Sequence, residues 1–330
     1  MSAYIIEGGH PLDGSVRIHG AKNSVLPILA ACLLAPGECV IHNCPELSDV
    51  AASLDILRHL GCRAERQGDA VVVDASAPTG WDVPDALMRE MRSSVIFLGA
   101  ILGRMGRAEL CAPGGCELGP RPIDLHLAAL ERMGAVIRED HGALDCTVPM
   151  GRLHGAEIVL SFPSVGATQN VLIAAVLAEG RTILRGAAQE PEIDDLIRFL
   201  NGAGARIRQD FAGTLIVDGV DSLHAVRHRV IPDRIAAATY LCCAAAAGGS
   251  ITVEGCVPAH LAAVLPPLEQ AGCRVRTWRD AVAITVPERL GSLGWVRTMP
   301  YPGFPTDAQA PLMAAALKAD GTTVFTETIF

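Results

Sequence analysis

Residues 28–42 read Ile-Leu-Ala-Ala-Cys-Leu-Leu-Ala-Pro-Gly-Glu-Cys-Val-Ile-His. The alanine-rich stretch predicts a helix, and Gly37 predicts its end, because glycine readily takes the left-handed backbone conformation that closes a helix. The apolar run after Gly37 predicts a strand. This succession of helix, glycine and strand recurs at intervals of roughly 70 residues, which is typical of a repeat protein. Its glycines are Gly37, Gly106, Gly180, Gly249 and Gly321.

A second marker has the same period. It is an amphipathic helix that ends in glycine before a strand, and its glycines are Gly61, Gly134, Gly204 and Gly272. Two independent markers with one period predict repeated βα units in an α/β architecture. The fifth unit begins at Gly321 and the sequence stops at Phe330. The spacing therefore predicts a closed array of six units of which the last part is missing.

Composition limits the class of protein. A chain of 330 residues predicts two domains, and 50% apolar residues with only 4% aromatic ones predict a core of Ala, Leu, Val and Ile. A net charge of −9 without a run of Lys and Arg argues against a nucleic-acid surface. The apolar run at 235–247 is too short for a membrane helix, so we expect a buried helix that holds Cys242 and Cys243.

The eleven cysteines show no Cys-x-x-Cys spacing, and no secretory leader precedes the first motif. Reduced thiols in a cytoplasmic protein are the expectation, rather than a disulfide framework. The ten histidines show no paired spacing, so no metal site is expected.

One loop has the residue types of a chemical site. Residues 112–126 read Ala-Pro-Gly-Gly-Cys-Glu-Leu-Gly-Pro-Arg-Pro-Ile-Asp-Leu-His, which places the thiol of Cys116 near Arg121 and Asp124. The alternative is a buried, inert thiol, but the polar Glu117 and two glycines beside Cys116 argue against burial. The arginine fork suits a phosphate or a carboxylate.

Five motifs occur in order: Gly20-Ala-Lys22-Asn23-Ser-Val-Leu-Pro, Met91-Arg92-Ser-Ser, the Cys116 loop through Arg121-Pro-Ile-Asp124-Leu-His, Phe162-Pro-Ser164-Val-Gly-Ala-Thr, and Phe304-Pro-Thr-Asp307. On these residues the chain resembles the UDP-N-acetylglucosamine 1-carboxyvinyltransferases from about Tyr4 to Phe330. The resemblance implies an EPSP synthase-like fold, a two-domain inside-out α/β barrel of repeated βα units. Residues 21–230 would form a complete domain with the Cys116 loop, and residues 1–20 plus 231–330 a second domain without its last part.

The resemblance also assigns roles. Lys22 would contact the phosphate of phosphoenolpyruvate, Cys116 would be the general acid, and Asp307 the general base. The substrate-binding residues would be Lys22, Asn23, Arg92, Arg121, Pro122, Ile123, Asp124, Leu125, Ser164, Val165, Gly166, Asp307 and Ile329. Simpler roles stay open: Lys22 as a solvated lysine beside a capping pair Asn23-Ser24, Ser164 in an ordinary turn, and Asp307 as a helix cap.

The reaction that the resemblance implies is addition followed by elimination, in which the 3′-hydroxyl of UDP-N-acetylglucosamine attacks C2 of phosphoenolpyruvate and phosphate leaves. It opens peptidoglycan synthesis, and with it cell wall biogenesis, cell shape and division, and it uses no cofactor. Nearby cations favour a thiolate at Cys116 in the free protein, which would react with fosfomycin. The negative charge of bound phosphoenolpyruvate opposes this effect, so we expect a protonated thiol, able to act as the acid, in the complex with both substrates. Rival functions are a truncated, non-catalytic nucleotide-sugar-binding protein and an enolpyruvyl transferase that acts on shikimate 3-phosphate.

Overall fold

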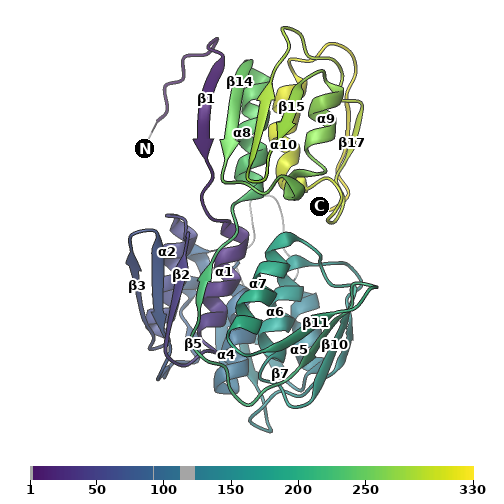
Figure 1. Ribbon diagram of the computed structural model, residues 1–330. Coiled ribbons are helices and arrows are strands. Elements are labelled where there is room, and N and C mark those ends of the chain that lie inside the picture. The colour runs from purple at the N-terminus through teal and green to yellow at the C-terminus, as the bar shows by residue number, and fades with distance from the viewer. Residues whose placement is uncertain (1–2, 92, 112–122) are drawn as a thin grey trace. The chain divides into compact units, whose positions relative to one another are not determined.

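The computed structural model describes residues 3–91, 93–111 and 123–330. The chain forms two compact units (Figure 1). The larger unit is Gly20–Ile231, and the smaller unit joins Met1–His19 to Pro232–Phe330. The arginine at 92, the Cys116 thiol, Arg121 and Pro122 lie outside the described residues.

The larger unit contains three four-stranded sheets with one connectivity. In each sheet one inner strand has a parallel neighbour from another repeat. Its other neighbour is antiparallel and is the second strand of the hairpin that follows it in the chain. The first sheet is β13 (Arg227–Arg229), β2 (Glu38–His42), β4 (Ala70–Asp74) and β3 (Arg63–Gln67). The second is β5 (Asp82–Val83), β6 (Arg107–Cys111), β8 (Ala143–Thr147) and β7 (Val136–Asp140). The third is β11 (Arg206–Gln209), β12 (Leu215–Asp218), β10 (Arg181–Arg185) and β9 (Glu157–Val159).

The helices of the larger unit pack inside these sheets (Figure 1). They are α1 (Lys22–Cys32), α2 (Ser48–His59), α3 (Asp85–Glu90), the short 3₁₀ helix η1 (Ser94–Ile96), α4 (Phe97–Met105), α5 (Asp124–Arg132), α6 (Val165–Ala175) and α7 (Pro191–Gly202). In α1 and α6 every residue after the first two or three is buried, on all sides of the helix. Such helices are apolar all round because they have no solvent face.

The smaller unit repeats the same sheet once, in the order β1 (Leu12–Arg17), β14 (Gly249–Glu254), β16 (Ala281–Thr285) and β15 (Arg274–Thr277). It also contains α8 (Arg234–Ala247), η2 (Pro258–Leu261), α9 (Leu265–Gln270), η3 (Thr306–Ala308), α10 (Gln309–Ala316) and a parallel pair of β17 (Trp295–Arg297) with β18 (Val324–Thr326). Its own core lies between α8, α10 and the sheet.

The marker glycines all have the positive φ that helix endings require, from Gly106 at 69° to Gly249 at 103°. The repeat therefore rests on backbone geometry as well as on composition, and the repeated βα units expected from the two markers are confirmed. One expectation is wrong. The apolar run forms α8, but only Cys242 is buried, whereas Cys243 is exposed. Among the described residues no helix is long and apolar enough to cross a membrane.

Candidate functional site

The predicted substrate residues of the larger unit that the structure describes lie at the starts of three helices from different repeats. Lys22 and Asn23 begin α1, Asp124 and Leu125 begin α5, and Ser164 precedes α6. The first N–H groups of a helix have no acceptor within the helix, and the helix dipole makes this end positive. The starts of α1 and α6, which have no acidic residue in the first turn, are therefore suited to an anionic group of a ligand.

Helix α6 joins these starts. Gln169 Nε2 donates a hydrogen bond to the backbone oxygen of Asn23 at 3.3 Å. On the other side, the His126 ring lies against Gly166, so that a Cβ at position 166 would be 3.0 Å from His126 Cε1. The structure therefore brings together the start of α1, the start of α5 and the start of α6. Gln169 and His126 were not predicted as site residues.

Ser164 is the N-cap of α6. Its Oγ accepts a hydrogen bond from Ala167 N at 3.3 Å, and its backbone oxygen accepts one from Thr168 Oγ1 at 2.8 Å. Within the described part of the chain no partner is found for the N–H of Val165 or Gly166. These two groups can therefore donate hydrogen bonds at this helix start.

Lys22 forms an ion pair with Asp49 on α2, with 3.3 Å between Nζ and Oδ2. The lysine side chain is 47% exposed, and an exposed pair of this kind contributes only about 0–1 kcal/mol to stability. The ion pair with Asp49 therefore holds Lys22 only weakly. The alternative of a capping pair is wrong: α1 begins at Lys22 with Ala21 as the N-cap, and Ser24 lies buried inside the first turn.

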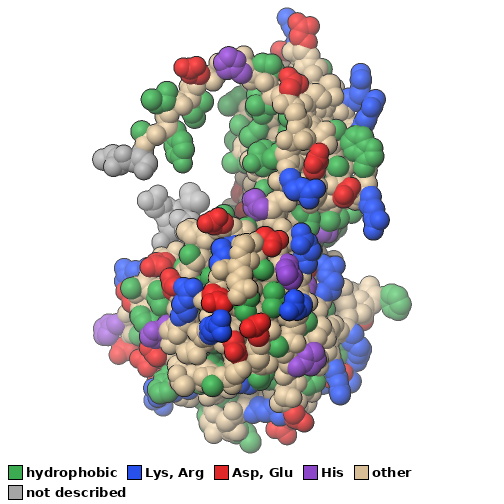
Figure 2. Space-filling model, turned by 60° about the vertical axis from the view of Figure 1, so that its left-hand side comes forward, with side chains coloured by type: hydrophobic (Ala, Val, Ile, Leu, Met, Phe, Trp, Pro, Cys, Tyr) green, Lys and Arg blue, Asp and Glu red, His purple; other side chains and the backbone are tan. Residues whose placement is uncertain are grey.

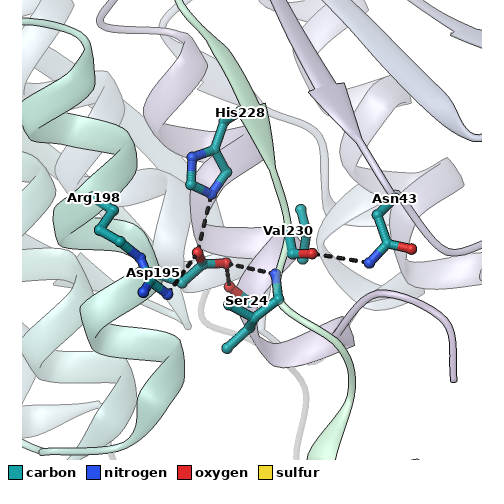
Figure 3. A network of polar contacts seen from close by, with 7 residues as sticks. Ser24, Asn43, Asp195, Arg198, His228 and Val230 are labelled. Carbon is teal, nitrogen blue, oxygen red and sulfur yellow. Dashed lines mark hydrogen bonds and ion pairs between the residues drawn. The ribbon is translucent and has the colours of Figure 1, made fainter. Parts of the chain in front are cut away.

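Ser24 belongs to a buried network around Asp195 of α7 (Figure 3). Asp195 Oδ2 accepts hydrogen bonds from Ser24 Oγ at 2.5 Å and from Ile231 N at 3.1 Å. Its Oδ1 accepts from His228 Nε2 at 3.1 Å and from Arg198 at 3.2 Å. Burial acts to raise the pKa of Asp195, but the hydrogen bonds from His228, Ser24 and Ile231 outweigh it and lower that pKa. The carboxylate thus fixes the start of α1 to α7 and to the strand that ends the unit.

The chain enters and leaves the larger unit beside this network. Ala21 N donates to Ile231 O at 2.8 Å, and Asn43 Nδ2 donates to Val230 O at 2.9 Å (Figure 3). A Cβ at Gly20 would lie 1.8 Å from the backbone oxygen of Asn43, so only glycine fits there. Asp195 could not be recognised from the sequence, because its partner Ser24 lies 171 residues away.

A cavity of about 270 Å³ lies between α5 and β9. It is lined by Leu125, Ala128, Ala129, Arg132, Glu157, Ile158, Val159 and Leu160. Of the predicted substrate residues that the structure describes, Leu125 alone lines it. The cavity walls are mainly apolar, with Arg132 and Glu157 as the charged groups.

In the smaller unit, Asp307 lies exposed in η3, and the helix after it has Ala308 at its cap without a side-chain hydrogen bond. The alternative of a helix cap is therefore not supported. Glu327, which the sequence analysis missed, connects this segment to Ile329. Its carboxylate accepts hydrogen bonds from Thr306 Oγ1 at 2.8 Å and from Ile329 N at 2.7 Å.

Glu327 also accepts a hydrogen bond from Thr298 Oγ1 at 2.7 Å. Burial acts to raise its pKa, but the hydrogen bonds from Ile329, Thr298 and Thr306 outweigh it and lower the pKa of Glu327. One ionised carboxylate thus holds the backbone of Ile329 and the side chain of Thr306, the neighbour of Asp307. Among the described residues no cluster of His, Cys, Asp and Glu could hold a metal ion. On the face of the larger unit shown in Figure 2, cationic and anionic side chains alternate.

Comparison with known proteins gives one consistent family. Residues 6–330 match the family model of EPSP synthase (3-phosphoshikimate 1-carboxyvinyltransferase). The chain is 46% identical over 330 residues to UDP-N-acetylglucosamine 1-carboxyvinyltransferase 2 of Caldanaerobacter subterraneus subsp. tengcongensis, covering 100% of this chain and 79% of the relative. It is 50% identical over 332 residues to UDP-N-acetylglucosamine 1-carboxyvinyltransferase 1 of Symbiobacterium thermophilum, covering 99% of this chain and 75% of the relative.

Solved structures give the same fold. The enolpyruvyl transferase NikO from Streptomyces tendae superposes with a TM-score of 0.86 at 28% identity, over 98% of this chain and 76% of that one. EPSP synthase from Acinetobacter baumannii superposes with a TM-score of 0.68 at 20% identity, over 96% of this chain and 74% of that one, which shows a shared fold alone.

Proposed function

We propose that this chain, which belongs to the EPSP synthase family of enolpyruvyl transferases, acts on UDP-N-acetylglucosamine. The relatives that match it over its whole length are UDP-N-acetylglucosamine 1-carboxyvinyltransferases. The chain transfers the enolpyruvyl group of phosphoenolpyruvate to the sugar 3′-hydroxyl and releases phosphate, the step that opens peptidoglycan synthesis. The structural observation that carries the proposal is the meeting of three helix starts around α6. Such a meeting suits a ligand with several anionic groups.

Each helix start takes one part of the substrates in this proposal. The N–H groups of Val165 and Gly166 and the hydroxyl of Ser164 hold the diphosphate. Ile123, Asp124 and Leu125, with Arg121 and Pro122, hold the uracil. Asn23 bonds the bound substrates, Lys22 exchanges Asp49 for the phosphate of phosphoenolpyruvate, and Arg92 and the Ile329 backbone contact the nucleotide sugar.

The reaction needs a base, an acid and cations, and no cofactor is required. Asp307 takes the proton of the sugar 3′-hydroxyl while the oxygen of that hydroxyl forms a bond to C2 of phosphoenolpyruvate. Cys116 donates a proton to C3 in the same step. In the second step C3 loses a proton and the bond from C2 to the phosphate oxygen breaks. The site of this reaction is the cytoplasm, and cell shape and division depend on its product.

The test is phosphate release by the purified chain with both substrates. Release that requires UDP-N-acetylglucosamine and is lost in Cys116→Ser supports the proposal. The matched control is Cys243→Ser, because this thiol is exposed in the smaller unit and has no assigned role. Binding of UDP-N-acetylglucosamine without phosphate release would instead favour a non-catalytic nucleotide-sugar-binding protein, and release with shikimate 3-phosphate would favour the other transferase.

Fosfomycin gives an independent readout. We propose that it alkylates Cys116, so intact-mass spectrometry should show one adduct, and peptide mapping should place it on that thiol among the eleven. An adduct distributed over several cysteines would argue against a formed pocket at Cys116.

A further inference from the structure

Helix α6 carries an unusual polar residue in its buried interior. Asn170 is completely buried, within a helix whose other buried residues are mostly Ala, Val, Leu and Ile. A buried amide costs free energy unless its hydrogen bonds are made, so each of its partners needs a reason.

The two backbone partners of Asn170 fix the orientation of its amide. Oδ1 accepts a hydrogen bond from Gly99 N at 2.7 Å, and Nδ2 donates one to Val95 O at 2.9 Å. A backbone N–H can only donate and a backbone carbonyl can only accept, so the amide cannot be reversed. A Cβ at position 99 would lie 2.4 Å from Asn170 Oδ1, which explains the glycine there.

The third partner is His126 of α5. Asn170 Nδ2 lies 2.9 Å from His126 Nδ1, and because Nδ2 can only donate, Nδ1 must accept. His126 is therefore neutral, with its proton on Nε2. Burial lowers the pKa of His126 to about 4, although the nearby Asp124 acts in the opposite direction. Its Nε2 faces the start of α6, where a Cβ at Gly166 would lie 3.2 Å away.

We call Asn170, His126, Val95 and Gly99 the Asn170 node. Two of its outer members, His126 and Val95, lie near segments that the proposed function assigns to the nucleotide sugar. His126 directly follows Asp124 and Leu125 and packs on Gly166, and Val95 lies in the turn after position 92. The node therefore sets the distance and angle between the start of α5 and the start of α6.

We propose that Asn170 is a positioning residue for the nucleotide sugar, acting through His126 on the relative placement of the uracil-binding and diphosphate-binding helix starts. This inference rests on the proposed function. Asn170 itself touches no substrate. Its loss should weaken binding of UDP-N-acetylglucosamine while leaving phosphoenolpyruvate binding and the chemical step nearly unchanged.

The test compares Asn170→Leu, which keeps the volume and removes the polar groups, with Leu172→Ala as the matched control. Leu172 is fully buried on the same helix, so its truncation lowers stability without touching the node. Calorimetric binding of UDP-N-acetylglucosamine and steady-state kinetics are measured for both. We expect Asn170→Leu to raise the Kd and KM for UDP-N-acetylglucosamine at least tenfold, while kcat and the KM for phosphoenolpyruvate stay within about threefold of the wild-type values. Leu172→Ala should leave the Kd and both KM values near those of the wild type.

A second variant guards against loss of folding. His126→Phe keeps a ring against Gly166 but has no acceptor for Asn170, and it should give the same split between the two KM values. Combined with Asn170→Leu it should add little further loss, because both act through one contact.

The outcomes separate the two proposals. If the wild-type chain fails to bind UDP-N-acetylglucosamine, the proposed function falls and the positioning role falls with it. If the wild type binds but both node variants bind equally well, or if the node variants lower kcat and raise both KM values together, only the positioning role is overturned.

Discussion

Replacing Asp195 with alanine should destabilise the larger unit by about 3–5 kcal/mol, the range for removing one partner from a buried charged network. The buried hydroxyl of Ser24 and the N–H of Ile231 would lose their acceptor, at about 1–3 kcal/mol each. Arg198 adds little, because its side chain is 59% exposed. Asp195→Asn keeps the volume and one acceptor, so its effect should be about 1–2 kcal/mol.

The assay is urea unfolding followed by tryptophan fluorescence. Trp81 lies in the larger unit, and Trp278 and Trp295 lie in the smaller one. A Trp278→Phe, Trp295→Phe background therefore lets Trp81 report on the larger unit, which avoids treating two units as one transition. Asp194→Asn is the matched control, because this neighbour is exposed and should change the free energy of unfolding by less than about 0.5 kcal/mol.

The pH dependence gives a further check. The pKa of Asp195 is lowered in the folded state, so its stabilising contribution is present above the unfolded value of about 3.9 and is lost as pH falls through the lower, folded value. The difference between wild type and Asp195→Asn should therefore shrink below pH 4. An Asp195→Ala variant that unfolds at the wild-type urea midpoint, or a difference that stays constant down to pH 2, would refute the anchoring role.

Three other predictions follow from the same structure. Glu327→Ala should lower kcat/KM at least tenfold, because it releases the Ile329 backbone and Thr306, the neighbour of Asp307. Replacing the exposed Glu288 with alanine should not change kcat/KM, and equal kinetics for both variants would contradict the role of Glu327. Iodoacetamide at pH 8 should label Cys243 quickly and Cys242, whose pKa burial raises to about 12, only after unfolding, as peptide mass spectrometry can show; similar rates would count against the burial of Cys242. The pKa of His126 in the folded chain is lowered to about 4, so as pH falls below 6.5 the imidazole is protonated first in the unfolded chain. By pH 4.5 the free energy of unfolding of the wild type should therefore fall by about 2–3 kcal/mol, a loss that His126→Gln should not show. Urea unfolding midpoints that fall in parallel for both proteins would disprove this.

Much of the fold could be predicted from the sequence, because glycines that close helices are a local signal. Gly106 and its equivalents have positive φ and mark the repeats directly. The starts of α1, α5 and α6 could be recognised from short motifs for the same reason. That these three helix starts lie together could not be predicted, because it depends on contacts between residues far apart in the chain. Gln169 bonds Asn23 across 146 residues, and Asn170 bonds His126 of a different repeat.

Other features depend on tertiary packing. The polar pair Gln169-Asn170 inside an apolar helix is a signal that could have been noticed, since polar side chains in such a position need partners. Asp195 and Glu327 gave no such signal, because acidic residues near helix and strand ends are usually solvated. Cys243 was misjudged because the composition of α8 does not tell which of two adjacent thiols faces the core.

Strands β13 and β1 each pair with a strand far away in the chain, and this affects the order in which the two units can fold during translation. Strand β1 at residues 12–17 leaves the ribosome early, but its parallel partner β14 begins at Gly249. At about 5–20 residues per second, β1 waits on the order of ten seconds or more with an unpaired edge. In that interval Gly20–Ile231 can complete its own three sheets, since β13 arrives before α8. Synthesis from the N-terminus therefore favours folding of the larger unit first. The smaller unit folds afterwards, when β14 pairs with β1, a strand that was synthesised much earlier.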